Sequence, residues 1–199
     1  DPVRTLTNRS TGAMGIELAR AFRDVGARVQ LVLGGDLPEP WGVETVRVRS
    51  AQQMLAACKA RWPDSEGFVA AAAVADQRPE AASPEKVKKT DGPETLTLVR
   101  TPDILATLAA GRRPEQWVVG FAAESEMHLE RAAEKLARKR LDAILVNDVQ
   151  AGRGFGAQAN TLTPLTAQGP QPVLGPLPKD QLARAVVQWW ARCLESGRD

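Results

Sequence analysis

The stretch "FVAAAAVADQRPEAASPEKVKK", residues 68–89, begins as an apolar run and ends with three lysines within four positions. An apolar run of this kind, over residues 67–75, predicts a strand buried on both faces, as in a parallel sheet. Asp76 follows the run without a linker, so we expect it at the carboxyl end of that strand. In open α/β sheets this is the edge where ligands bind. The stretch therefore predicts both the fold class and the place of the site.

Strands and helices alternate on both sides of this stretch. Apolar residues at helical spacing predict helices, the first of which has Gly26 as its C-cap. Apolar or alternating runs predict strands. Thr101 is expected to be the N-cap of the helix after residue 100, with Pro102 in its first turn. The predicted helices cover residues 15–25, 51–62, 101–109 and 126–140, and the predicted strands cover 27–35, 43–49, 67–75, 95–100, 116–124 and 141–148.

The C-terminal quarter predicts a different arrangement. Residues 160–166 and 169–177 are rich in proline, which favours an antiparallel pair of strands at a sheet edge. The last helix begins at Lys179 and carries Leu182, Val186, Trp189 and Cys193 on one face. The whole predicts one α/β domain over residues 1–199, with a mostly parallel central sheet, helices on both faces and a late antiparallel edge pair.

Composition limits the classes of function. The chain of 199 residues is 43% hydrophobic and 25% charged, with a formal net charge of +2. This balance gives no indication of nucleic-acid or membrane binding. No apolar run approaches the roughly 20 residues that would span a bilayer. Cys58 and Cys193 lack the spacing of a metal or redox pair, so we expect free thiols in a reducing cytoplasm.

A polar, glycine-rich turn, "TNRSTGAMG" at residues 7–15, leads directly into the first helix. Backbone amides at a helix start, with the Ser10 and Thr11 hydroxyls, form an anion site. The alternative is that a hydroxyl caps the helix and the glycines only relieve crowding. A further alternative is NAD binding, because Asp36 follows the glycines at the distance of a ribose-binding acid. The turn offers only G-x-x-G, which argues against that.

Two groups of cations complete the candidates. Alternation around Val87 places Lys86 and Lys88 on one side of an extended segment. Arg131, Lys135 and Lys139 recur every four residues on one helix face. Both groups have an ordinary explanation as solvated charge. The only histidine, His128, lies among acidic residues, and no nucleophile with a paired base is recognisable. This pattern favours catalysis by positioning and charge stabilisation.

Several segments together resemble the phosphopantothenate-cysteine ligase family, the synthetase half of the bifunctional bacterial coenzyme A enzymes. These segments are "DPVRTLTNRSTGAMG", "AAVADQRP", "PEKVKK", "TPDIL", "VGFAAES", "RLDAILVND" and "GFGAQAN", in the family's order. The resemblance implies a Rossmann-like, ribokinase-related three-layer sandwich and a cytoplasmic homodimer with its active site near the interface. It also implies Mg²⁺ as cofactor and CTP, 4'-phosphopantothenate and L-cysteine as substrates. The carboxylate would be activated as an acyl-cytidylate and then condensed with cysteine.

The resemblance assigns roles by motif. Asn8 would contact the acyl-cytidylate carbonyl, and Lys86, on a flap, would neutralise negative charge as pyrophosphate leaves; these are the expected catalytic residues. Ser10 and the Gly12 turn would hold phosphate. Asp76 would lie at the CTP and Mg²⁺ site. The other expected CTP contacts are Ala72, Ala73, Pro102, Asp103, Ile104, Leu105, Phe121, Lys135 and Lys139.

The chain departs from the family pattern in places. Ala13 stands where lysine is usual and Gln77 where tyrosine is common, which concerns substrate affinity. The family also has a strand before "DPVR", central in the sheet, so we expect the natural protein to be longer. If the natural protein also carries the flavin-binding decarboxylase domain of these bifunctional enzymes, that domain and its FMN would lie upstream of these residues. The alternatives to the ligase are an NAD(P)-dependent oxidoreductase and a non-catalytic nucleotide-binding or oligomerisation module.

Overall fold

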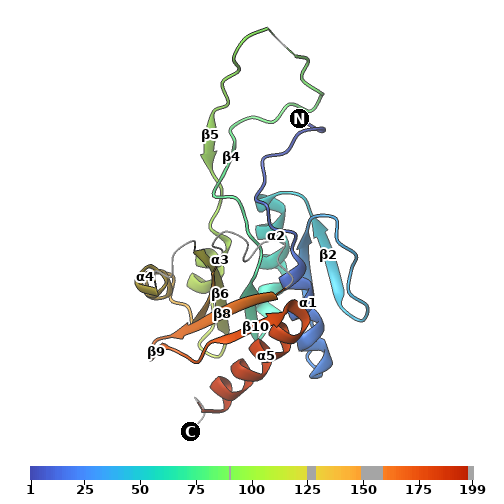
Figure 1. The fold of residues 1–199 in the computed structure, drawn as a ribbon. Helices are drawn as coiled ribbons and strands as arrows, with labels where there is room; N and C mark the ends of the chain where they lie inside the picture. Colours follow the sequence, from blue (N-terminus) through green and yellow to red (C-terminus); the bar gives the residue numbers. More distant parts are fainter. Residues whose placement is uncertain (90, 125–128, 149–158, 197–199) are drawn as a thin grey trace.

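A computed structural model describes residues 1–89, 91–124, 129–148 and 159–196 of the chain (Figure 1). Its main sheet has the strand order β10-β8-β7-β6-β3, with β9 paired to β8. The strands β3, β6 and β7 are parallel, whereas β8 runs antiparallel to both β7 and β10. The protein is therefore an α/β protein whose central sheet is mixed. The strands of this sheet are β3 (Gly67–Ala70), β6 (Trp117–Glu124), β7 (Ala143–Asp148), β8 (Ala159–Thr166), β9 (Gly169–Pro170) and β10 (Leu174–Pro178).

Helices cover both faces of this sheet. One core contains α1 and α5 against Val119 and Leu145, and the other contains α2, α3 and α4 against Val118 and Ile144. Neighbouring residues of a strand face opposite sides, which is why Val118 and Val119 divide between the two cores. Because side chains alternate along the strands, each face of the sheet offers apolar side chains against which one layer of helices packs. The helices are α1 (Ala13–Asp24), α2 (Ala51–Arg61), the 3-10 helix η1 (Trp62–Asp64), α3 (Ile104–Ala110), α4 (Leu129–Lys139) and α5 (Lys179–Ser196).

Several predicted helix signals are confirmed. Gly26, just past α1, has a φ of +89°, the left-handed conformation expected of a C-capping glycine. The helix predicted over 51–62 is present as α2, and Ser50 and Gln53 form a capping box there that was not predicted. In α5, Leu182, Val186 and Trp189 are all buried. The residues 126–128 of the predicted helix 126–140 lie outside the described part of the chain.

The predicted cap of α3 is wrong. Asp103, rather than Thr101, is the N-cap, and its carboxylate accepts a hydrogen bond from the Ala106 amide. The Thr101 hydroxyl instead donates to the Ala75 carbonyl, 2.5 Å away. Pro102 therefore precedes the helix instead of lying in its first turn. A contact with a distant loop has displaced the local capping preference.

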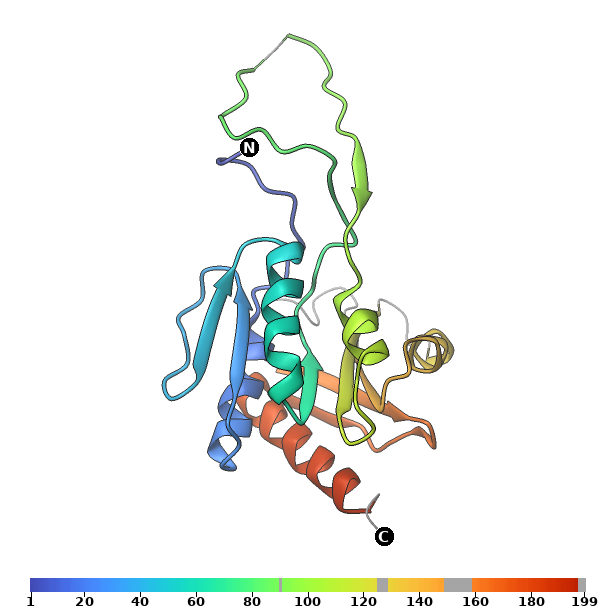
Figure 2. The same ribbon diagram turned by 180° about the vertical axis from the view of Figure 1, so that it is seen from behind.

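The strand predicted over 67–75 is also too long. The strand β3 ends at Ala70, and residues 71–76 form an irregular loop at its carboxyl end. A run of alanines specifies little, because short side chains pack equally well in extended and irregular backbone. Beyond this loop, β4 (Gln77–Pro79) pairs antiparallel with β5 (Leu98–Arg100). Residues 77–100, called the arm below, project from the body of the protein (Figures 1 and 2).

The expectation that both proline-rich strands lie at the edge is half correct. Within the main sheet β10 is an edge strand, but β8 lies between β7 and β10. Pro164 is accommodated inside the sheet because it still offers a carbonyl, which accepts a hydrogen bond from the Gln171 amide. Proline therefore marked the correct pair of strands but not their position.

A second, two-stranded parallel sheet is formed by β1 (Gln30–Gly34) and β2 (Glu44–Val48). Among the described residues, β1 pairs only with β2, and β3 pairs only with β6. A cavity of about 1380 Å³ is lined by both β1 and β3. The facing backbone edges of these strands have no ladder partner in the described part of the chain, which leaves a gap in what would otherwise be one continuous sheet.

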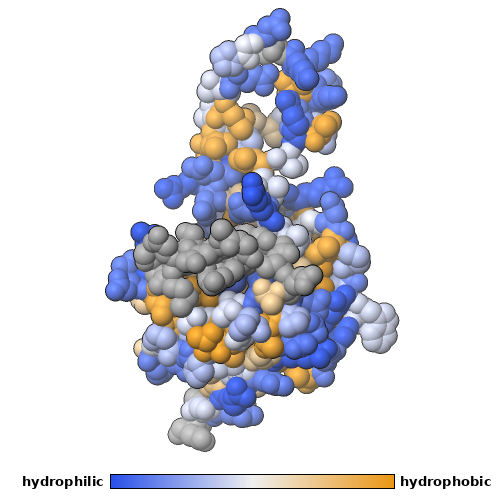
Figure 3. Space-filling view, in the orientation of Figure 1, coloured by the Kyte–Doolittle hydropathy of each residue, from blue (hydrophilic) through white to orange (hydrophobic). Residues whose placement is uncertain are grey.

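Two surface properties bear on partners. No helix among the described residues is long and apolar enough to cross a membrane. The arm and the segment beside it expose large apolar side chains, visible in orange in Figure 3. Those exposed by more than a third are Val3, Leu6, Val87, Leu96 and Leu98. Apolar side chains gathered on a projecting element are typical of a contact surface.

Candidate functional site

The cavity reaches the carboxyl ends of β1 and β3, the edge where the sequence predicted a site. At this edge it is lined by loops that follow the strands and by cations from α4. Most residues with an expected role in CTP binding line it. They are Gly12, Ala72, Asp76, Pro102, Asp103, Ile104, Leu105, Phe121, Lys135 and Lys139. Residues from five separate segments of the chain are thus brought to one hollow.

The glycine-rich turn enters α1 without a conventional side-chain cap. Gly12 is the N-cap, with a φ of +81°, and no side chain accepts a hydrogen bond from the first turn at that position. The Ser10 and Thr11 hydroxyls accept bonds from the Gly12 and Ala13 amides at 3.4 and 3.3 Å. The alternative of a hydroxyl N-cap is therefore not what the structure has. Gly12 and Gly15 line the cavity, so the start of α1 lies at its edge.

Two hydrogen bonds fasten this turn and α3 to the loop after β3. The Asn8 side-chain amide donates to the Ala73 carbonyl at 3.0 Å. On the other side, the Thr101 amide donates to the Asp76 carbonyl at 2.9 Å. The loop 71–76 is thus held from both sides, and its exposed alanines, Ala72 and Ala73, leave the backbone open to a ligand.

Charge gathers where α3 meets α4. The Lys139 ammonium lies 2.6 Å from the Asp103 carboxylate, and the Lys135 ammonium donates to the Phe121 carbonyl at 2.9 Å. Lys135 and Lys139 lie on the same helix face, one turn apart, and point toward the strand ends. Arg131, the third cation of the predicted stripe, is exposed and does not line the cavity. The site therefore has two positioned lysines at its rim.

The Asp103 carboxyl carries a perturbed pKa. Its partial burial raises the pKa, but the bonds from Lys139 and the Ala106 amide outweigh burial, so the net pKa lies below the usual value. A lowered carboxyl pKa stabilises the folded state above the unfolded-state pKa, and this contribution is lost as pH falls through the folded-state pKa.

We therefore expect Asp103→Asn to cost stability in a pH-dependent way. The free energy of unfolding should fall by less than about 1 kcal/mol at pH 7, because the carboxylate is half exposed and screened by solvent. Urea unfolding at pH 7 and at pH 3 measures this. The difference between wild type and variant should shrink at pH 3, and an equal difference at both values would contradict the ion-pair account.

Asp76 is exposed at the end of the loop, and no cluster of three metal-ligating side chains occurs among the described residues. A single carboxylate is nevertheless a suitable partner for Mg²⁺, which keeps several waters and is commonly completed by substrate phosphates. The donor set present is therefore compatible with a magnesium–nucleotide complex and unsuited to a protein-only metal centre.

Lys86 is not brought to this cavity. It lies exposed on the arm, together with Lys88 and Lys89, and none of the three lines the cavity. The arm stands away from the strand ends in both views (Figures 1 and 2). The expected flap lysine thus requires a change in the position of the arm to meet a ligand in the cavity.

The structure points to one polar residue that the sequence reasoning did not select. Asn147 lies at the carboxyl end of β7, in register with Ala123 of β6, and its buried Oδ1 has no hydrogen-bond partner among the described residues. Buried polar atoms are rarely left unpaired. A polar residue ending an apolar run, as in "ILVND", was the signal available. His128 and the "GFGAQ" part of the last motif lie outside the described residues.

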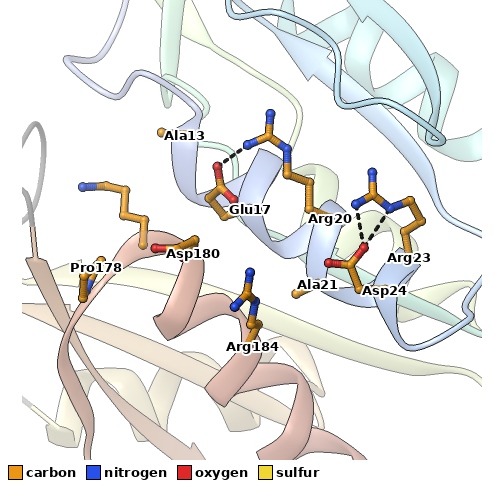
Figure 4. A pocket seen from close by; sticks show the side chains of 10 residues that line it. Ala13, Glu17, Arg20, Ala21, Arg23, Asp24, Pro178, Asp180 and Arg184 are labelled. Carbon is orange, nitrogen blue, oxygen red and sulfur yellow. Dashed lines mark hydrogen bonds and ion pairs between the residues drawn. The ribbon is translucent and has the colours of Figure 1, made fainter.

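A second hollow, of about 640 Å³, lies between α1 and the start of α5 (Figure 4). Its acids and bases largely neutralise one another, since Arg20 pairs with Glu17 and Arg23 pairs with Asp24, each at 2.6 Å. None of the residues with an expected chemical role lines it. This hollow is therefore not the candidate site.

Comparison with known proteins gives a consistent result. Residues 1–193 match the model of the family described as DNA/pantothenate metabolism flavoprotein C-terminal domain. The chain is 44% identical over 191 residues to the coenzyme A biosynthesis bifunctional protein CoaBC of Vibrio cholerae, covering 94% of the chain and 48% of that relative. It is 46% identical over 166 residues to the CoaBC protein of Bacillus subtilis, covering 82% and 41%. The chain thus spans about half the length of the curated relatives that it matches.

Solved structures agree. The C-terminal domain of a CoaBC protein superposes with a TM-score of 0.81 at 34% identity, covering 98% of this chain and 89% of that one. A more distant structure, a Cab2 mutant in complex with phosphopantothenate-cysteine, has a TM-score of 0.76 at 14% identity, covering 99% and 83%. At that identity the second match supports the fold alone.

Proposed function

Since the chain belongs to the family of the DNA/pantothenate metabolism flavoprotein C-terminal domain, we propose that it is a phosphopantothenate-cysteine ligase of coenzyme A biosynthesis. The observation that carries the proposal is the joining of loops far apart in sequence at one sheet edge. The Asn8–Ala73 and Thr101–Asp76 hydrogen bonds bring the anion turn, the loop after β3 and the start of α3 together beside Lys139.

The proposed reaction has two steps. A carboxylate oxygen of 4'-phosphopantothenate attacks the α-phosphorus of CTP, which gives an acyl-cytidylate and releases pyrophosphate. The amine of L-cysteine then attacks the acyl carbon, loses a proton and expels CMP, forming the amide of 4'-phosphopantothenoylcysteine. Both nucleophiles belong to substrates, which accounts for the lack of a recognisable nucleophile and base in the sequence. The protein's task is to position the reactants and stabilise charge.

Different residues would contribute to positioning and charge stabilisation according to where they lie in the site. The α1 amides, with Ser10 and Gly12, bind a phosphate group at the positive end of the helix. Lys135 and Lys139 face negative charge on the nucleotide from the rim of the cavity. The backbone of Ala72 and Ala73 and the start of α3 from Pro102 to Leu105, with Phe121, surround the rest of CTP.

Asp76 would hold Mg²⁺ together with the CTP phosphates. When bound, the ion neutralises phosphate charge and favours the departure of pyrophosphate. Lys86 acts on the same charge from the other side, when the arm brings it over the site.

The proposal is tested by pyrophosphate release from the purified chain with Mg²⁺, 4'-phosphopantothenate and either CTP or ATP. Release that requires both phosphopantothenate and CTP, in the absence of cysteine, supports acyl-cytidylate formation. NADH binding in place of CTP binding would favour an oxidoreductase instead, whose support is limited to Gly12, Gly15 and Asp36. Tight CTP binding without any pyrophosphate release would favour a non-catalytic nucleotide-binding module.

Asn8→Asp is expected to separate the two steps. In this proposal Asn8 donates a hydrogen bond to the acyl-cytidylate carbonyl, and a carboxylate at its position would repel the developing oxyanion. Amide formation should fall about 100-fold while acyl-cytidylate still accumulates. Quenched-flow detection of the intermediate with labelled CTP measures this. Equal losses in pyrophosphate and amide formation would contradict a role confined to the second step.

We further propose that the enzyme acts in the cytoplasm as a homodimer with its active sites near the interface. The apolar side chains exposed on the arm support this, because a second copy would cover them. Sedimentation of the chain gives the oligomeric state, and replacing Leu96 and Leu98 by serine should shift it toward the monomer. A dimer unaffected by these changes would place the interface elsewhere.

We also propose that the sheet is completed as a ribokinase-related three-layer sandwich by a strand between β1 and β3, from residues outside 1–199. The unpaired facing edges of β1 and β3, and their parallel direction, support this. In a longer version of the protein, the backbone amides of β1 that point away from β2 should exchange with solvent far more slowly. Unchanged exchange would exclude a strand at that position.

A further inference from the structure

The N-terminal segment fastens the arm through one nearly buried carboxylate. The Asp1 side chain is only 1% exposed, although most of its neighbours in residues 1–9 are exposed. Its Oδ1 accepts hydrogen bonds from the Val3 and Arg4 amides at 3.0 and 2.9 Å. Its Oδ2 accepts from Arg4 Nε at 2.9 Å and from the Val87 amide at 3.2 Å. A carboxylate so fully satisfied is held in one orientation.

The same two residues hold both backbone groups of Val87. Asp1 accepts from the Val87 amide, and the Arg4 guanidinium reaches the Val87 carbonyl at 3.5 Å. Val87 lies between Lys86 and Lys88 in an extended stretch, so fixing its peptide groups fixes the directions of the neighbouring side chains. Asp1 and Val87 are 86 positions apart, and the contact therefore depends on the tertiary structure.

The other end of this segment is anchored in the site. Four residues after Arg4, the Asn8 side chain is bonded to the Ala73 carbonyl in the loop after β3. Residues 1–8, called the strap below, thus connect the Lys86 segment to the loop that lines the cavity. The position of Lys86 relative to the site is constrained at both ends of the strap.

We propose that Asp1 is a positioning residue that sets Lys86 for the proposed ligase reaction, acting through Arg4 and the peptide groups of Val87. The expected effect of Asp1 on turnover rests on the proposed function, whereas its role in holding the Lys86 segment does not. The strap connects Asn8 and Lys86, the two residues with expected catalytic roles, through its contacts with the loop after β3 at one end and with Val87 at the other.

Asp1→Asn is the sharpest test, because it preserves size and one acceptor. The amide nitrogen would take the place of Oδ2 and face donors from Arg4 and Val87 instead of accepting from them. Asp91→Asn is the matched control, since Asp91 is an exposed acid on the same arm with no contact to the strap.

The first readout is independent of activity. Limited trypsin digestion of the folded protein, followed by mass spectrometry, measures cleavage after Lys86 and Lys88. Cleavage should become about tenfold faster in Asp1→Asn and stay unchanged in Asp91→Asn, because cleavage requires local release of the segment. Equal cleavage in wild type and Asp1→Asn would overturn the proposal.

The second readout is pyrophosphate release. Asp1→Asn should lower kcat/KM for CTP about tenfold, while the KM for cysteine stays the same. In a Lys86→Gln background the additional loss from Asp1→Asn should disappear, since both changes remove the same interaction. Additive losses would overturn the proposal. If Lys86→Gln itself leaves turnover intact, the proposed role of Lys86 fails, and the trypsin readout still decides whether Asp1 holds the arm.

Discussion

Lys86→Gln is expected to lower pyrophosphate release from CTP and 4'-phosphopantothenate by about 100-fold or more, with the protein still folded. Removing one group that stabilises charge at a reacting centre typically has an effect of about this size. The fold should be unaffected, because Lys86 is exposed on the arm and makes no contact with either core.

The measurement is steady-state pyrophosphate release at saturating Mg²⁺, with KM determined separately for CTP and phosphopantothenate. We expect the loss to appear in kcat, because Lys86 meets the reactants only when the arm closes. Lys59→Gln is the matched control: Lys59 is an exposed lysine of α2, away from the arm. A Lys86→Gln variant with the kcat of wild type would remove the flap from the mechanism.

Gly67→Ala is expected to give the largest loss of stability. A Cβ at Gly67 would lie 2.0 Å from the Trp117 indole ring, far inside contact distance. The ring cannot easily withdraw, because it packs against Phe22 and Trp190, with centroids 6.1 and 5.4 Å away. Overpacking at such a position costs about 3 kcal/mol or more of unfolding free energy.

Chemical unfolding of the variant measures this loss. Gly111→Ala is the control, since a Cβ there would meet only ordinary contacts, 3.7 Å from the Thr107 carbonyl. It should change stability by less than about 0.5 kcal/mol. Similar stabilities for the two variants would show that Trp117 can move away from β3, contrary to the packing described.

The regular elements were largely predictable, because their signals are local. The apolar runs over 116–124 and 141–148 and the apolar stripe of the last helix can each be read from one short window of sequence, and the structure confirms them as β6, β7 and α5. Prediction failed where side chains have partners elsewhere. Thr101 is not the N-cap of α3, because its hydroxyl is bonded to the Ala75 carbonyl. The alanine run does not continue the strand, since β3 ends at Ala70.

The candidate site was predicted in part. Polar residues after apolar runs indicated a sheet edge that the cavity reaches, and most residues to which the resemblance assigns CTP contacts, such as Asp76 and Lys139, line this cavity. Neither approach indicated that Lys139 pairs with Asp103 or that Lys86 stands outside the cavity. Those facts depend on the packing of α3 against α4 and on the direction in which the arm leaves the sheet.

The sequence by itself determined which segments become strands and helices and which of their ends carry amides, carboxylates and lysines. Hydrophobic periodicity, capping and turn preferences act over a few residues, so they can be read from the chain directly. Only the tertiary structure decided which ends meet. The Asn8–Ala73 and Asp1–Val87 contacts join residues 65 and 86 positions apart. Such contacts depend on the order of the strands in the sheet, because burial of both helix layers, and not any local preference, brings the loops together.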